Sequence, residues 1–133
     1  MGSVSFYKVT DTAFSAEALL DDGGRITVNL CGSADANAAS HLQLMLNRMQ
    51  MQTRRQPTEE VVVDFRQLDF MVSSCFKSLL SWINNVSDAS SQEQYRIRFL
   101  SDSKYMWQRR SLRSLQALSH ELVSIEFEIN FAE

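Results

Sequence analysis

The sequence is poor in the residues that carry metal, redox or nucleic-acid chemistry. Its two cysteines and two histidines (His41 and His120) have no companion ligands at metal-binding spacing. Lysine and arginine number 13 against 16 acidic residues, a net charge of −3, which leaves no concentrated basic surface for nucleic acid. No apolar run approaches the roughly 18 residues of a membrane span, and no signal-peptide pattern is present. We therefore expect a cytoplasmic protein with no cofactor, no metal, no nucleic-acid partner and no direct membrane insertion.

The hydrophobic content is sufficient for an ordinary globular core. Hydrophobic residues make up 44% of the 133 residues, so disulfide staples are not needed. Cys31 and Cys75 fall in or beside predicted buried elements, and we interpret both as reduced core thiols. No repeat, long linker or low-complexity tract divides the chain. We expect a single domain over residues 1–133.

Several segments have the alternating or short apolar patterns of strands. Residues 3–20 contain strand-like runs separated at Thr10, and the Asp-Asp-Gly-Gly sequence at 21–24 predicts a hairpin. Residues 25–31 alternate, and Gly32 is expected to end that strand. The remaining predicted strands are the valine run at 61–63, residues 95–100 and residues 123–131. The last has a polar face with glutamates, which suits the edge of a sheet.

Three segments have the periodicity of amphipathic helices. They are residues 38–52, a helix containing Phe76, Leu79, Leu80 and Ile83, and residues 104–118. We expect Ser101 to Ser103 to cap the third helix, with Trp107, Leu112, Leu115 and Leu118 facing inward. Residues 53–58 and 84–94 are expected to be exposed connections.

The resulting order, β-β-β-α-β-α-β-α-β, predicts an α/β fold. Alternating βα units imply right-handed crossovers and a mixed, mostly parallel sheet, with an antiparallel hairpin at its N-terminal side. Three main helices would pack against one or both faces.

Residues 60–83 organise this arrangement, because they comprise a buried strand, a serine pair and a buried helix face. Ser73 and Ser74 fall on a predicted loop where the helix should start, and loops of this kind often carry function. One of the two serines is expected to be the helix N-cap, which would contribute about 0.5–2 kcal/mol.

Three stretches resemble the STAS domain, the fold of bacterial anti-sigma-factor antagonists. Residues 30–42 (LCGSADANAASHL) resemble its strand end and first helix, with Gly32 and Asp35 at the most recognisable positions. Residues 61–80 (VVVDFRQLDFMVSSCFKSLL) resemble its next strand and serine loop. The matching positions there are Asp64, Phe70, Ser73, Ser74 and Leu80. Residues 97–127 resemble the final βαβ unit, so the likeness covers nearly the whole chain and implies a single STAS-like domain.

The resemblance implies a bacterial regulatory protein that binds a partner kinase or anti-sigma factor. The family's loop usually reads Asp-Ser-Ser/Thr-Gly-Leu-Gly, and its first serine, which the partner phosphorylates, corresponds to Ser73. Val72, Cys75 and Lys77 stand where the family has aspartate, glycine and glycine. The implied partner-binding residues are Asp35, Ser73, Ser74, Phe76 and Lys77.

Phosphorylation would add roughly −1.5 to −2 charges at a helix start, where an anion is tolerated, and would repel a partner docked there. The departures from the family's loop also fit a constitutive, unphosphorylated subunit or scaffold, as in a lipid-transport ATPase or a stress-signalling assembly. A homodimer is a further alternative.

Catalysis is not expected. Ser73 has no plausible base, because neither histidine lies in a segment that this topology would bring beside it. The sequence contains no Gly-x-Ser-x-Gly elbow and no phosphate-binding glycine loop. We therefore predict a non-catalytic protein-interaction module.

Overall fold

The computed structural model describes residues 2–128. Within this range the elements follow the predicted order. The strands are β1 (Ser3–Thr10), β2 (Phe14–Asp21), β3 (Arg25–Ala34), β4 (Glu60–Met71), β5 (Arg96–Asp102) and β6 (Val123–Glu128). The helices are α1 (Ala36–Arg55), α2 (Ser73–Asp88) and α3 (Met106–Gln116). Residues 129–131 of the last predicted strand lie outside the described residues.

The described strands form a six-stranded sheet whose spatial order, β1-β2-β3-β4-β5-β6, is also the chain order. β1 pairs with β2, and β2 with β3, in antiparallel fashion. The pairings from β3 to β6 are all parallel. The predicted α/β fold with a mixed, mostly parallel sheet is therefore confirmed, and β6 lies at an edge as expected.

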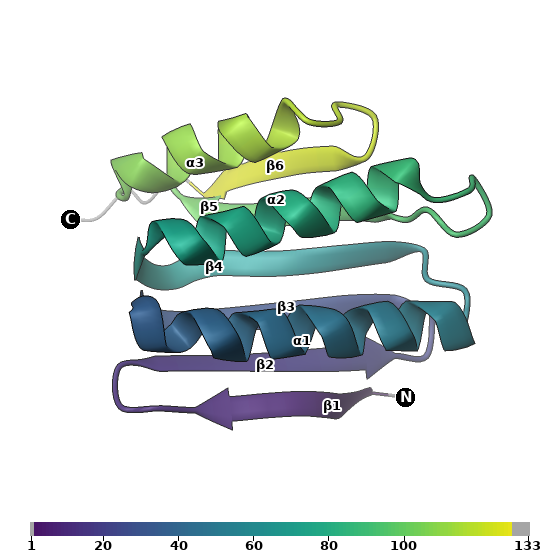
Figure 1. The fold of residues 1–133 in the computed structure, drawn as a ribbon, viewed down its shortest axis with the longest axis horizontal. Coiled ribbons are helices and arrows are strands. Elements are labelled where there is room, and N and C mark those ends of the chain that lie inside the picture. Colours follow the sequence, from purple (N-terminus) through teal and green to yellow (C-terminus); the bar gives the residue numbers. More distant parts are fainter. Residues whose placement is uncertain (1, 129–133) are drawn as a thin grey trace.

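All three helices cover the same face of the sheet (Figure 1). Each parallel crossover advances by one strand in the same direction, and right-handed crossovers of that kind place every helix on one side. α1 contacts α2, and α2 contacts α3. The sequence left open whether the helices cover one face of the sheet or both. In the structure they cover one face (Figure 1).

The core lies between this helical layer and the sheet. Alternate residues of β3, namely Ile26, Val28 and Leu30, are buried beneath the helices. Phe65 of β4 and Phe99 of β5 make an edge-to-face pair with ring centroids 5.6 Å apart. The burial of one face per strand explains why period-2 patterning predicted these strands.

The uncovered face of the sheet carries a chain of charges across four strands. Glu60 accepts a hydrogen bond from Arg25 Nε at 3.0 Å and lies 3.2 Å from Arg98 Nε. Arg98 Nη1 in turn donates to Glu126 at 2.9 Å. These oppositely charged pairs link neighbouring strands across the uncovered face.

Gln108 of α3 is a polar residue at the centre of the core. Its side chain is 0% exposed, and its Nε2 donates to the carbonyls of Phe65 and Leu68, both at 2.7 Å. Its Oε1 accepts from the Ser101 hydroxyl at 2.7 Å and from the Asp102 N–H at 3.1 Å. Gln108 thus joins α3 to β4 and β5, and sequence patterning alone did not identify it.

Both of the first two helices are longer than predicted. α1 continues through residues 53–55, which were expected to belong to a linker, and it ends at Arg55 with Gln56 as its C-cap. The terminator is Pro57, because the residue before a proline is pushed into an extended conformation. α2 includes residues 84–88, expected to be a connection, since buried Val86 extends its apolar face by another turn.

The predicted start of the third helix is wrong. Ser101 and Asp102 belong to β5, and α3 begins at Met106 without a side-chain cap. Both residues are buried and bonded to Gln108, so they are committed to the core. Leu118 is exposed because α3 ends at Gln116, whereas Leu112 and Leu115 face inward as expected.

Two predictions about β3 are also wrong. Cys31 is exposed, because it points to the uncovered face, opposite to Leu30. Gly32 does not end the strand, which continues to Ala34. It instead has φ of +90°, and a Cβ there would collide with the carbonyl of Ala13. The glycine permits the close approach of the β1–β2 turn.

Candidate functional site

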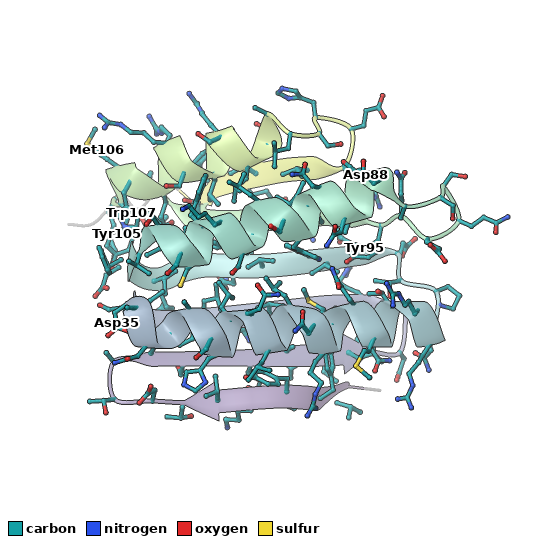
Figure 2. All side chains as sticks on the ribbon, in the orientation of Figure 1. Asp35, Asp88, Tyr95, Tyr105, Met106 and Trp107 are labelled. Atoms are coloured by element: carbon teal, nitrogen blue, oxygen red, sulfur yellow. The ribbon has the colours of Figure 1, made fainter. Side chains whose placement is uncertain are left out.

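The carboxyl ends of the parallel strands and the starts of all three helices lie at one end of the molecule (Figure 1). Figure 2 shows Asp35, Tyr105, Met106 and Trp107 at this end, and Asp88 and Tyr95 at the opposite end. In open α/β sheets, binding sites gather at the carboxyl ends of the strands. The sequence-predicted site residues belong to this region.

Asp35 is the N-cap of α1. Its Oδ1 accepts hydrogen bonds from the backbone N–H groups of Asn37 and Ala38, at 3.0 and 3.2 Å. Since this carboxylate satisfies otherwise unpaired N–H groups of the first turn, it stabilises the helix start by about 1 kcal/mol. The residue is half-buried, and its backbone carbonyl lies 4.0 Å from Cys75 Sγ in the first turn of α2.

Ser73 and Ser74 are the first two residues of α2, and both are exposed. The prediction that one of them is the N-cap is wrong, because Val72 occupies that position without a side-chain cap. The Val72 N–H donates to the Ala34 carbonyl at 2.8 Å, which prolongs the extended backbone of β4 by one residue. The expected serine loop is therefore reduced to Val72, and the serine hydroxyls are not used to cap the helix.

Cys75 lies beneath the serine pair and packs the starts of α1 and α2 together. Its thiol is buried, with Sγ 4.0 Å from the carbonyl oxygens of Ala34 and Asp35. Burial, and secondarily the neighbouring Asp35 carboxylate, raise the pKa of the thiol to about 11. A thiol with so high a pKa is not a nucleophile at neutral pH, so Cys75 is a packing residue.

A groove of about 320 Å³ runs between the start of α2 and the middle of α3. Its lining residues are Met71, Ser73, Phe76, Arg110, Ser111 and Ser114. Phe76 is half-buried, and Lys77, one turn after Ser73, is exposed. Arg110 lines this groove, whereas Arg109 lies over the ring of Phe127, 5.4 Å from its centroid. The groove thus combines two apolar side chains with three serines and one arginine.

Two large apolar side chains that were not predicted as site residues are exposed at this end. Phe70 at the end of β4 is 50% exposed, and Met106 at the start of α3 is 72% exposed. Trp107 is partly buried, and its Nε1 donates to the Asp69 carbonyl at 2.9 Å, which holds α3 against the end of β4. Met106 gave no signal in the sequence, because its exposure depends on where α3 begins.

We call these residues the strand-end surface. It consists of Asp35, Phe70, Ser73, Ser74, Phe76, Lys77, Met106 and Arg110. In residues 2–128 no group of three or more histidine, cysteine, aspartate or glutamate side chains could hold a metal ion. Over the same range, no helix combines the length and apolarity needed to cross a bilayer. The strand-end surface therefore presents exposed apolar side chains, serine hydroxyls and basic side chains to a binding partner.

A solved structure with the same fold is an anti-sigma factor antagonist from Mycobacterium paratuberculosis. The two structures superpose with a TM-score of 0.60 at 13% sequence identity, over 95% of this chain and 92% of the other. No protein-family model matches the sequence. No curated protein matches it either. The structural match therefore confirms the fold implied by the resemblance.

Proposed function

We propose that this chain is a non-catalytic regulatory module that binds a protein partner through the strand-end surface. The observation that carries the proposal is the exposure of Phe70 and Met106 at the same end of the molecule as Ser73, where α/β folds bind ligands. Exposed apolar side chains ringed by polar groups are typical of protein docking sites. The fold shared with an anti-sigma factor antagonist supports a regulatory role.

The partner is of the kinase or anti-sigma type, and the encounter takes place in the cytoplasm of a bacterium. Phe70 and Met106 would be buried at the centre of the contact, where apolar side chains supply most of the affinity. Lys77 and Arg110 lie at the margin, so a partner with acidic residues around an apolar centre fits best. Asp35 would contact the partner while it caps α1.

Phosphorylation of Ser73 would switch this contact off. The side chain is exposed, and no side chain caps α2, so the first backbone N–H groups of the helix can receive phosphate oxygens. Lys77, four residues along the helix, and Arg110, across the groove, would offset the added charge. The fold would be retained, while the docking surface would gain a bulky anion that the partner must desolvate.

The test compares charge variants of two exposed serines on the same helix. Ser73→Asp is expected to reduce the amount of partner captured from native-cell lysate by about 100-fold, because the added carboxylate must be desolvated on docking and would face the acidic residues of the partner. Ser81→Asp, two turns further along α2, is the matched control and is expected to leave capture unchanged. Met106→Lys should also abolish capture. Equal capture by Ser73→Asp and the unmodified chain would contradict the switch.

A constitutive subunit is the second candidate, and the residues around Ser73 favour it. Val72 and Lys77 replace the family's aspartate and second glycine, and the bulk of Cys75 fills the space between α1 and α2. In this version the same surface holds a permanent partner, such as a transport ATPase or a scaffold, and Ser73 is never modified. Intact-mass measurement on protein from its native cell distinguishes the two: a phosphate at Ser73 supports switching, and an unmodified mass with a co-purifying complex supports the subunit.

A further inference from the structure

β1 is an edge strand with little protection against pairing. Its eight residues, Ser3–Thr10, contain no proline and a single charged residue, Lys8. Its outer backbone edge has no partner strand in residues 2–128. A bulge between Ser5 and Tyr7 is its only departure from regular pairing with β2. Natural edge strands usually carry more charge or proline, because a bare edge recruits another strand.

The large exposed apolar side chains beside β1 lie on the same edge. Val4 is 69% exposed, and on α1 Leu44 and Met51 are 55% and 61% exposed. Met51 shares a groove with Phe6 of β1, so this side of α1 borders the strand. Leu44 is seven residues before Met51 and therefore lies on the same side of the helix. The outer edge of β1 and this side of α1 together form one surface. We call it the β1 edge, and its exposed apolar residues are Val4, Leu44 and Met51.

The middle of β1 lies beside the middle of α1. The Tyr7 hydroxyl donates to the His41 carbonyl at 3.2 Å, whereas Phe6 contacts the groove formed by residues 48–55. A two-fold axis through the centre of β1 therefore also passes close to Leu44, at the midpoint of α1. Self-pairing of the strand would bring Leu44 of the two copies together.

Charge is segregated along this edge in a way that suits antiparallel pairing. Asp11, whose carboxylate lies 3.5 Å from His41, is near the start of α1. Arg48 and Arg55 lie toward its end, where they line the groove beside Phe6. A two-fold axis sets the acidic end of one copy opposite the basic end of the other and also opposes the two helix dipoles. The surface is thus complementary to itself.

We propose that the β1 edge is a homodimer interface, in which β1 pairs antiparallel with β1 of a second copy. Main-chain hydrogen bonds would join the two six-stranded sheets into one, and the apolar side chains of β1 and α1 would be buried across the two-fold axis. The strand-end surface of each copy lies outside this contact, so dimerisation and partner docking are independent.

Size-exclusion chromatography with light scattering tests the proposal on the whole chain. At about 0.5 mM protein, where a dimer with a micromolar Kd is saturated, the expected mass is twice the 15.2 kDa of the monomer. Val4→Lys and Leu44→Lys should each raise the Kd of the dimer about 100-fold, because each buries an unpaired charge in both copies. Circular dichroism verifies that these exposed positions tolerate lysine without unfolding.

Met106→Lys is the matched control, since Met106 is as exposed as Val4 but lies on the strand-end surface. It should leave the dimer mass unchanged while it abolishes partner capture, and Val4→Lys should do the reverse. A monomer mass at 0.5 mM, or a dimer that survives both Val4→Lys and Leu44→Lys, would overturn the interface. Neither result would bear on the strand-end surface.

Discussion

Removal of the Gln108 side chain should come close to unfolding the protein. Its amide makes four hydrogen bonds in a site that is 0% exposed, to the carbonyls of Phe65 and Leu68, the N–H of Asp102 and the hydroxyl of Ser101. Gln108→Met keeps the length of the side chain but replaces every polar atom. The carbonyls of Phe65 and Leu68 and the N–H of Asp102 then lose their hydrogen-bond partner in the buried core.

The magnitude follows from those three backbone groups. Each buried unsatisfied group costs about 1–3 kcal/mol, so the loss for Gln108→Met is about 3–9 kcal/mol. The Ser101 hydroxyl can rotate toward another acceptor and adds little. Domains of this size are stable by only about 5–15 kcal/mol, so the variant would lose a large part of its free energy of unfolding.

Urea unfolding followed by circular dichroism measures the effect. With a slope of about 1.5 kcal/mol per molar urea, a loss of 4 kcal/mol lowers the midpoint by about 2.5 M. Gln116→Ala is the control on the same helix, because the Gln116 side chain donates to the Val123 carbonyl over a long distance of 3.3 Å. We expect that control to change the unfolding free energy by less than about 1 kcal/mol.

Gln108→Glu adds a pH signature that a simple packing defect would not produce. An ionised carboxylate would face the carbonyls of Phe65 and Leu68, so burial should raise its pKa in the folded state above that in the unfolded chain. The stability deficit relative to the parent should then be smallest below about pH 4 and should grow as pH rises. A pH-independent deficit, or a loss below 1 kcal/mol for Gln108→Met, would refute the role assigned to Gln108.

Three further predictions concern the strand ends. Gly32→Ala should lower the free energy of unfolding in urea by about 2 kcal/mol or more, because φ is +90° and the new Cβ would strike the Ala13 carbonyl. The control is Gly23→Ala, where φ is not positive, and it should lower the free energy of unfolding by less than about 1 kcal/mol. Asp35→Ala should lose about 1 kcal/mol of cap energy, whereas Asp35→Asn keeps the cap and tests only the charge in partner capture. The raised pKa of Cys75 contributes stability that is fully present below the ordinary pKa of 9.0 and is lost as pH rises through about 11. Stability should therefore fall over this window by up to about 3 kcal/mol, a slope that Cys75→Ala removes; an unchanged slope would contradict it.

The candidate site was only partly accessible from the sequence. Ser73 could be located, because a buried strand and a buried helix face bracket it in residues 60–83. The role of its hydroxyl could not be predicted, because β4 continues to pair with β3 up to Val72, and Val72 rather than a serine is the N-cap of α2. Met106 was missed because long-range contacts of Ser101 and Asp102 with Gln108 fix where α3 starts.

The sequence by itself determined the order of elements, the fold class and most of the buried faces, because alternation in strands and 3.6-residue periodicity in helices are local consequences of which side is buried. The tertiary structure decided the remaining features. It placed all helices on one face, which exposed Cys31, and its strand order left β1 at an open edge. It also buried Gln108 and gathered Phe70, Ser73 and Met106 at one end. These features depend on contacts between residues far apart in the chain, and no local pattern encodes them.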